Sequence, residues 1–480
     1  MALSLVLVSS VASTARADGL ERVRSRGTLR WAGDIQGGEP YVYQDPHDAS
    51  RLIGFEVEIA DALARRLGLR AEFVQNDWQT LIPSLQRGDF DLVLNGLEVT
   101  SARRAQVSFT RPYYAFAETL VVRRDWPTND LQDLRGRRVG TLGASLAYDL
   151  LLAVPGLQVV SYEGVQEPYI DLEQGRVDAV VLDNIIASRY GLPRASLRAA
   201  ATVGEGVYAG ALRREDSALL FALDSALAAM TQDGELRDIL TRWNLWDSRQ
   251  TMLANVRTPG VEGDQARGSV ATQIPLFLRG AAVTLVISAL AMTLAVSGGL
   301  LLSLSARYGG DLLATLSSIY VELFRGTPVL LQLYVLYYGL APVVTLSAFT
   351  AAIIGLGMNY AAYEAELYRA GLQAVPAGQS EAAAALGMSR RLALRRIVLP
   401  QALRVALPGM ANDFIALLKD SSLVSVITVV ELTKQMTITA VDLRSWLVPG
   451  LMCAVLYLAL SYPLSRLARR LERRLAPVSA

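Results

Sequence analysis

The stretch "EAAAALGMSRRLALRRIVLP" (residues 381–400) decides how this chain is organised. It begins with a glutamate and a run of alanines, passes Gly387, and continues with four arginines before Pro400. Glycine is costly inside a helix, so Gly387 predicts a turn. Long apolar segments flank the stretch, and arginine side chains cannot remain in hydrocarbon. The stretch is therefore predicted to lie in water beside a membrane, with a small-residue face suited to docking on another protein.

Five apolar segments around this stretch are long enough to cross a bilayer. They comprise residues 274–305, 312–341, 346–372, 406–430 and 446–464. Glu322 and Arg325 interrupt the second segment, and the fourth is polar enough to predict a broken span. Arginines in short loops favour the cytoplasmic side, which places the loop at Arg307, residues 376–404 and the C-terminal tail there. We expect an all-α membrane domain over residues 271–480.

Residues 18–247 have a different pattern, because charged residues are spread between short strand-like runs. The apolar positions of "GFEVEIADALARRLGL" (54–69) follow helical spacing up to Gly68, whereas "FDLVLNG" (90–96) is typical of a buried strand. Regular alternation of strand and helix predicts α/β layers with parallel sheets. At this length, two lobes are expected.

The two ends of the α/β region have their own signatures. Residues 248–270 lose the periodicity and are rich in glycine, proline and charge, which predicts a linker. Residues 1–17 hold an apolar core and an Ala-x-Ala site at 15–17, which predicts a signal peptide, although its basic region is missing. A disordered or buried N-terminal segment is the alternative.

The composition excludes several classes of function. The net charge of +1 gives no global field for nucleic acid. Cys453 is the only cysteine and excludes an intramolecular disulfide, and the only histidine, His47, lies in a turn-rich stretch expected to be solvated. We therefore expect no metal site, no cofactor and no catalytic residue. The phosphate-binding pattern G-x-x-x-x-G-K-[ST] is absent from the sequence, so ATP is expected to bind to a separate partner.

The opening stretch resembles the EAA loop of ATP-binding-cassette (ABC) importer permeases, whose pattern is E-A-A-x3-G-x9-I-x-L-P. Glu381, Ala382, Ala383 and Gly387 match its first half, and residues 397–400 match its end without a gap. The phrases "ELFRGTP" and "LLKDSSL" elsewhere in the membrane half resemble the polar amino-acid branch of that family.

This resemblance implies partners and a location. The cytoplasmic EAA loop, residues 376–402, would form a coupling helix that docks on an ABC ATPase subunit through Glu381, Ala382, Ala383 and Gly387. Two membrane subunits frame one path in the family, so a homodimer in the bacterial inner membrane is expected. An interfacial membrane helix is the alternative interpretation of the loop alone.

Residues 27–247 resemble the type II periplasmic amino-acid-binding proteins, through "DWQTLIPSLQRGDFDLVLNGLEVTSARR" (77–104) and "GRVDAVVLDN" (175–184) among other phrases. The resemblance implies two lobes that close around a free L-amino acid outside the cell membrane. Lobe 1 would comprise about 18–112 and 205–247, and lobe 2 about 113–204.

The same resemblance assigns roles in the ligand site. Arg103 would bind the carboxylate of the amino acid and Asp183 its ammonium group, since each charge needs an opposite partner. Trp78 would pack on the ligand side chain, Ser145 would offer a hydroxyl at the start of a helix in the second lobe, and Tyr41 would lie close by.

Further positions of this site depart from the family or act through the backbone. Gly96 and Leu97 would offer backbone groups to the ligand. Glu98 stands where the family usually has Thr or Ser, and it could pair with Arg103 or face a cationic ligand. Asp34 matches an acidic position seen in binders of polar or basic amino acids.

The sequence therefore predicts a fused receptor and permease that imports a polar or basic L-amino acid. Two alternatives come from other classes. A glutamate-receptor-like ion channel would have membrane helices inside the receptor and a filter such as T-V-G-Y-G, and neither is found in the sequence. A periplasmic enzyme on the same fold, such as a dehydratase or a transglycosylase, would have no use for five spans and a coupling loop.

Overall fold

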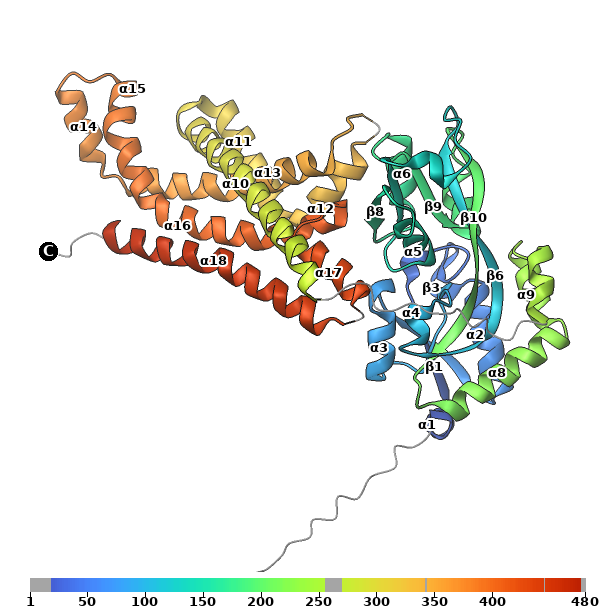
Figure 1. Ribbon diagram of the computed structural model, residues 1–480. Helices are drawn as coiled ribbons and strands as arrows, with labels where there is room; N and C mark the ends of the chain where they lie inside the picture. Colours follow the sequence, from blue (N-terminus) through green and yellow to red (C-terminus); the bar gives the residue numbers. More distant parts are fainter. Residues whose placement is uncertain (1–18, 255–269, 342, 444, 476–480) are drawn as a thin grey trace, which may run out of the picture. The chain divides into compact units, whose positions relative to one another are not determined.

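The computed structural model describes residues 19–254 and 270–475, except residues 342 and 444 (Figure 1). The described residues form two compact units, one with most of residues 19–254 and one with the helices from residue 270 onward. The expected signal peptide and residues 255–269 of the expected linker lie outside the described residues.

The first unit is built on an eight-stranded sheet with the strand order β4-β1-β5-β10-β6-β9-β7-β8. These strands are β1 (Thr28–Gly33), β4 (Arg70–Gln75), β5 (Leu92–Val93), β6 (Ser108–Arg123), β7 (Arg138–Leu142), β8 (Gln158–Tyr162), β9 (Ala179–Asp183) and β10 (Leu197–Leu212). β1 runs parallel to β4 and β5, and β7 runs parallel to β9, as the alternating pattern predicted. A separate hairpin is formed by β2 (Tyr43–Asp45) and β3 (Asp48–Ile53).

Two long antiparallel strands, β6 and β10, join the lobes, and each has 16 residues. β5 pairs with β10 near one end, at Ala211, whereas β9 pairs with β6 near the other end, at Leu120. Lobe 1 therefore carries β4, β1 and β5, and lobe 2 carries β9, β7 and β8. The side chains between β6 and β10 belong to both lobes.

Helices follow most of the strands and cover the sheet (Figure 1). They are α1 (Gly19–Arg26), α2 (Phe55–Arg66), α3 (Leu81–Arg87), α4 (Ser101–Arg104), α5 (Leu146–Leu152), α6 (Glu167–Glu173), α7 (Asn184–Ile186), α8 (Ser217–Gln232) and α9 (Glu235–Arg242). α2 shows why they form, since Phe55, Ile59 and Leu63 lie four residues apart and are all fully buried. The chain leaves α2 at Gly68, whose φ of +73° suits glycine.

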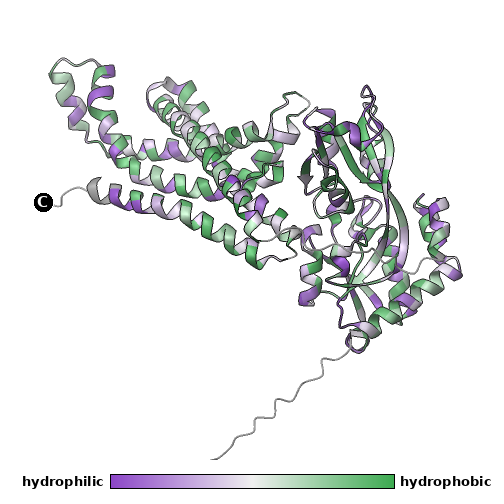
Figure 2. Ribbon diagram, in the orientation of Figure 1, coloured by the Kyte–Doolittle hydropathy of each residue, from purple (hydrophilic) through white to green (hydrophobic). Residues whose placement is uncertain are grey.

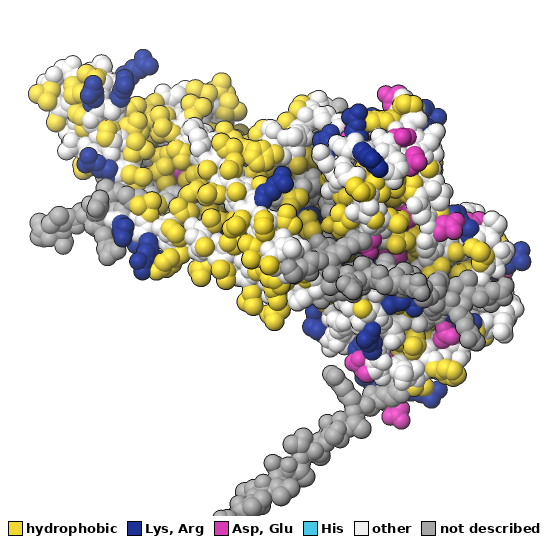
Figure 3. Space-filling view, viewed as in Figure 1, with side chains coloured by type: hydrophobic (Ala, Val, Ile, Leu, Met, Phe, Trp, Pro, Cys, Tyr) yellow, Lys and Arg dark blue, Asp and Glu magenta, His cyan; other side chains and the backbone are white. Residues whose placement is uncertain are grey.

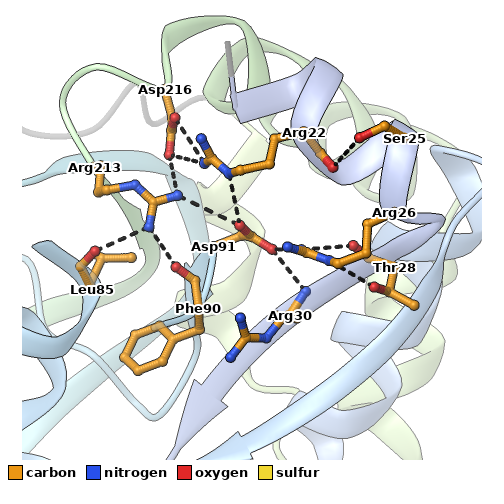
Figure 4. Close-up of polar contacts among 10 residues, drawn as sticks. All are labelled: Arg22, Ser25, Arg26, Thr28, Arg30, Leu85, Phe90, Asp91, Arg213 and Asp216. Atoms are coloured by element: carbon orange, nitrogen blue, oxygen red, sulfur yellow. Dashed lines mark hydrogen bonds and ion pairs between the residues drawn. The ribbon is translucent and has the colours of Figure 1, made fainter. Parts of the chain in front are cut away.

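A network of buried charges ties α1 to lobe 1 (Figure 4). Asp91, which precedes β5, pairs with Arg26 and lies 3.7 Å from Arg22 Nε and 3.6 Å from Arg213 Nη2. Asp216 accepts from Arg22 Nη2 at 3.0 Å and pairs with Arg213 Nη2 at 2.6 Å. Three guanidinium groups thus surround two buried carboxylates, which we call the α1 network.

The first residues of the expected linker pack against the α/β unit. Residues 248–254 form a short 3-10 helix, and the buried Gln250 exchanges two hydrogen bonds with the backbone of Ala115 on β6. The side chain of Gln250 thus pairs with the backbone of β6 as a neighbouring strand would. The sequence around Gln250 does not indicate this contact.

The second unit is helical and mostly apolar (Figure 2). Its helices are α10 (Val270–Tyr308), α11 (Gly310–Gly326), α12 (Val329–Tyr334), α13 (Ala348–Ala374), α14 (Ala377–Ala385), α15 (Arg390–Ala393), α16 (Leu399–Asp420), α17 (Leu432–Asp442) and α18 (Leu447–Leu475). Length and composition let α10 and α18 cross a membrane, and the segment 310–339 adds a third span if its 105° bend is accepted.

The other two predicted spans, α13 and α16, are long enough but carry polar residues that lower their hydropathy. In α13 these residues face neighbouring helices, since Asn359 Nδ2 donates to Phe324 O at 3.0 Å and Glu364 is fully buried. Gly371 lets α13 approach α16 closely, because a Cβ there would lie 2.5 Å from Ala402 O.

The fourth predicted span is broken, as its polar residues predicted, and a further helix follows it. α16 ends at Asp420 and continues as a 3-10 helix to Ile427, so the span predicted at 406–430 is broken. The residues between the fourth and fifth predicted spans hold α17. Its polar residues have partners inside the unit, such as Gln273 for Thr439 at 3.1 Å, which local sequence cannot show.

Candidate functional site

Arg103 lies where the lobes meet, on the short helix α4 that Thr100 caps by accepting a hydrogen bond from Arg103 N. The residue is 8 % exposed, and its guanidinium stands over the ring of Trp78, 4.9 Å from the ring centroid. Arg103 Nη2 crosses to lobe 2 and donates to Ala144 O at 2.6 Å. The guanidinium is therefore buried and shared between the lobes, as a residue that binds a ligand carboxylate needs to be.

The carboxylate of Glu98 accepts hydrogen bonds from Arg103 and from the first residue of α5. Its Oε2 accepts from Arg103 Nη1 at 3.0 Å and from the backbone N–H of Leu146 in lobe 2 at 2.9 Å. The residue is 5 % exposed, and burial raises the pKa of Glu98 to about 7 although Arg103 opposes this rise. Of the two roles that the sequence left open, the contacts show the pairing of Glu98 with Arg103.

Asp183 stands at the end of β9, on the lobe 2 side of the same junction. Its Oδ1 accepts from the backbone N–H groups of Ile185 and Ile186, at 2.8 and 2.9 Å, and from Tyr41 OH at 3.1 Å. Tyr41 OH also lies 3.2 Å from Tyr208 OH, so two tyrosines from lobe 1 and β10 reach this carboxylate. Burial raises the pKa of Asp183, which favours a cationic neighbour.

Trp78 and Asp34 support one another. Asp34 Oδ2 accepts from Trp78 N at 2.9 Å, and Asp34 Oδ1 accepts from Gln75 Nε2 at 3.1 Å and from Gln36 N at 3.0 Å. Trp78 Nε1 then donates to Gly143 O of lobe 2 at 3.1 Å. Asp34 therefore positions the loop that carries Trp78, and its carboxylate has three protein donors of its own.

The remaining predicted residues are close by, and several of their polar groups already form hydrogen bonds within the protein. Gly96 has a φ of +57°, and its N–H donates to Glu56 Oε1 at 2.5 Å. Leu97 O accepts from Ala209 N at 3.1 Å, while the Leu97 side chain packs in the core of lobe 1. Ser145 Oγ caps α5 through Tyr148 N at 3.1 Å and donates to Leu142 O at 2.7 Å.

Sequence reasoning missed one acidic residue at this junction. Glu118 lies on β6, opposite Asp183 in the strand register, and is 1 % exposed. Neither of its carboxylate oxygens accepts a hydrogen bond of normal geometry. Burial, together with the charges of Glu98 and Asp183, raises the pKa of Glu118 well above its usual range. A glutamate inside the otherwise apolar run "AFAETLVV" (115–122) was the available signal.

We call Glu98, Arg103, Glu118 and Asp183 the inter-lobe cluster. It holds three carboxylates and one guanidinium, all of them buried. A cavity of about 300 Å³ is lined by residues of both lobes, among them Pro40, Tyr114 and Asn184, but by none of the four cluster residues. In the part of the chain that the structure describes, no group of three or more His, Cys, Asp or Glu side chains could hold a metal ion.

The predicted coupling loop forms a helix, a turn and a second short helix. α14 ends at Ala385, and Gly387 turns the chain with a φ of +76°. The turn is closed by Gly387 N donating to Ala384 O at 2.9 Å and Met388 N donating to Ala383 O at 3.0 Å. The turn predicted at Gly387 is therefore confirmed, and its cause is a left-handed backbone that glycine adopts freely.

The exposed face of this loop differs from the predicted set. Glu381 and Ala382 are exposed, but Ala383 is only 1 % exposed because it packs inside the chain. Leu386, which sequence reasoning missed, is 81 % exposed and follows the alanines directly. Arg390, Arg391, Arg395 and Arg396 are also exposed, and Figure 3 shows basic side chains gathered at this end of the helices.

The second unit also contains a polar cavity of about 470 Å³. Its lining includes Arg325, Asn359, Tyr360, Asp413 and Asp420, and Tyr360 OH donates to Asp420 Oδ2 at 2.7 Å. Polar and charged side chains inside a membrane domain are costly and mark solute pathways.

Comparisons with known proteins match the two halves separately. Residues 32–245 match the family described as bacterial extracellular solute-binding proteins, family 3. Residues 295–477 match the family described as binding-protein-dependent transport system inner membrane component.

Individual relatives agree with this division. The chain is 39% identical over 206 residues to the probable amino-acid permease protein YxeN of Bacillus subtilis (strain 168), which covers 42% of this chain and 92% of that protein. It is 37% identical to the glutamine transport system permease protein GlnP of Escherichia coli (strain K12), over 42% of this chain and 94% of that protein. It is 31% identical to the ABC transporter arginine-binding protein 1 of the same strain, over 40% of this chain and 82% of that protein.

Among solved structures, an ancestral arginine-binding protein bound to arginine is 34% identical, with a TM-score of 0.42, over 45% of this chain and 98% of that one. The chain belongs to the amino-acid ABC transporters and joins their substrate-binding protein and their permease in one polypeptide. Both matching families are transport components and not enzymes, and the ion-channel alternative is not favoured.

Proposed function

We propose that this chain takes up a polar or basic L-amino acid outside the inner membrane and passes it to its own permease domain, while a separate ABC ATPase hydrolyses ATP. The ligand would bind at the inter-lobe cluster, with its carboxylate near Arg103 and its ammonium group near Asp183. Joining the receptor to the permease makes delivery intramolecular, at an effective concentration on the order of millimolar.

The five predicted spans would place the receptor outside and the arginine-rich loop inside. Two copies of the chain would pair to frame one path, as the family's two membrane subunits do. The polar cavity at Arg325 and Asp413 supports a route through the second unit, because a charged amino acid needs polar groups along its way.

The single observation that carries this proposal is the geometry of the coupling loop. Glu381, Ala382 and Leu386 are exposed around a glycine turn, beside a row of solvated arginines. Docking on an ATPase would bury Leu386, whereas anchoring at lipid headgroups would depend on the arginines.

Uptake assays separate these two roles. In cells that express the chain with its ATPase, Gly387→Asp strains the left-handed turn by about 1 kcal/mol and adds a charge beside Leu386, so uptake and ATP hydrolysis should collapse while receptor binding stays unchanged. Arg390→Ala should have a much smaller effect, because single solvated arginines contribute little. Loss of uptake in Arg390→Ala with normal uptake in Gly387→Asp would make the loop a membrane anchor and remove the support for coupling.

A further inference from the structure

Glu98 already holds two of the donors that a substrate carboxylate could use. Its Oε2 accepts hydrogen bonds from Arg103 Nη1 at 3.0 Å and from Leu146 N at 2.9 Å. One oxygen of Glu98 therefore bridges the two lobes. Arg103 also donates to two backbone carbonyl oxygens, from Nη1 to Glu98 O at 2.9 Å and from Nη2 to Ala144 O at 2.6 Å. A substrate carboxylate that binds both Arg103 Nη1 and Leu146 N must therefore displace Glu98.

The charges around Glu98 make this displacement selective. Asp183 and Glu118 are buried beside it, and among the described residues neither carboxylate oxygen of Glu118 has a hydrogen-bond partner of normal geometry. When a zwitterion enters, its ammonium group and its carboxylate cancel, and the displaced Glu98 stays in the same acidic surroundings. The cluster then still has more carboxylates than cations, and a positive charge on the ligand side chain is the addition that reduces the excess.

We propose that Glu98 is an internal competitor for the carboxylate of the substrate, and that it makes the receptor select amino acids with a cationic side chain. This inference rests on the proposed function, because it assumes that the inter-lobe cluster is the ligand site. It narrows the substrate class from polar or basic to basic, and it assigns that choice to one residue.

The test compares ligands that differ by a single charge. Full-length chain in detergent micelles is titrated calorimetrically with L-arginine and with L-citrulline, which has nearly the same shape but a neutral side chain. We expect arginine to bind at least about 30-fold more tightly, the ratio typical of one buried charge interaction. In Glu98→Gln, citrulline should gain affinity and the ratio should fall below about fivefold. Glu72→Gln, which removes the same charge from an exposed position on β4, should keep the wild-type ratio.

Agmatine, which is arginine without its carboxylate, tests the displacement itself. The wild-type chain should bind agmatine more weakly than arginine, because agmatine cannot replace Glu98 at Arg103. Tighter binding of agmatine would overturn the inference, since Glu98 would then remain on Arg103. Equal binding of arginine and citrulline by the wild type would also overturn it, and this comparison holds even if Glu98→Gln fails to fold.

The same titrations separate this inference from the proposed function. Tight binding of a neutral amino acid such as L-glutamine, with arginine bound more weakly, would contradict the role of Glu98 and leave the importer intact. Binding of none of the twenty L-amino acids would instead contradict the proposed function.

Discussion

The α1 network and the inter-lobe cluster are both groups of charged side chains around buried carboxylates, and they differ in the balance of positive and negative groups. The α1 network surrounds Asp91 and Asp216 with three arginines, and Arg213 directs Nη1 to the carbonyl oxygens of Leu85 and Phe90 (Figure 4). Its charges are satisfied by the protein. The inter-lobe cluster has three carboxylates for one guanidinium, and among the described residues neither carboxylate oxygen of Glu118 has a hydrogen-bond partner of normal geometry.

This difference separates structure from function. A group in which every charge has its partners within the protein stabilises one arrangement of the chain. A group with more carboxylates than cations at the junction of two lobes is completed by a cation from outside, so perturbed carboxylates there indicate a binding site. Changes in the first group should alter stability without altering ligand affinity, and changes in the second should alter affinity.

The largest expected effect on stability is in the α1 network. Asp91→Ala leaves Arg26 and Arg213 without their shared carboxylate, and removing one partner of a buried ion pair typically costs about 3–5 kcal/mol. Thermal and urea unfolding of the full-length chain should show this loss. Amino-acid affinity of the protein that remains folded should match the wild type, and a large loss of affinity at equal stability would break the comparison.

A smaller, pH-dependent effect on stability is expected at Glu56, whose carboxyl accepts the hydrogen bond of Gly96 N. Burial raises the pKa of Glu56 to about 7, against 4.5 for an ordinary glutamate, so between these values the folded chain holds a proton that the unfolded chain has released. The neutral Glu56 carboxyl therefore contributes its full stability below about pH 4.5. This contribution to the free energy of unfolding is lost as the pH rises through about 7. Glu56→Gln should therefore gain up to about 3 kcal/mol relative to the wild type at pH 8 and nothing at pH 4. Parallel stability curves for the two proteins from pH 4 to pH 8 would contradict this.

The smallest effect is expected at an exposed ion pair. Arg65 pairs with Glu235 at 2.5 Å, but the Arg65 side chain is 65% exposed. Because solvent screens such pairs, Arg65→Ala should change the free energy of unfolding by less than about 1 kcal/mol, measured by urea unfolding. A loss as large as that of Asp91→Ala would mean that burial does not decide the strength of these pairs.

Much of the fold and part of the site follow from local sequence. The alternating pattern gave the α/β order, and Gly387 gave the turn, because periodicity and glycine conformation act over a few residues. The match of "GLEVTSAR" and "VVLDN" to a known family placed Arg103 and Asp183, and the structure brings both to the junction of the lobes.

Other features depend on contacts between distant segments. Glu98 meets Leu146 N across 48 residues, and Gln250 meets Ala115 across 135, so neither contact has a local signature. Glu118 was passed over because an apolar strand dominates its surroundings, and α17 because its polar residues resemble a loop until their partners are known. Exposure of Leu386 likewise emerges only once the turn is built.

Binding of an amino acid at the inter-lobe cluster is the central claim, and Arg103→Ala tests it most directly. Calorimetric titration of the full-length chain with the twenty L-amino acids should give saturable binding of at least one of them. Arg103→Ala should weaken that binding by roughly 30- to 4000-fold, the equivalent of about 2–5 kcal/mol for loss of one partner of a buried charge pair. If Arg103→Ala binds the same amino acid as tightly as the wild type does, the ligand lies elsewhere and the account of the site is wrong.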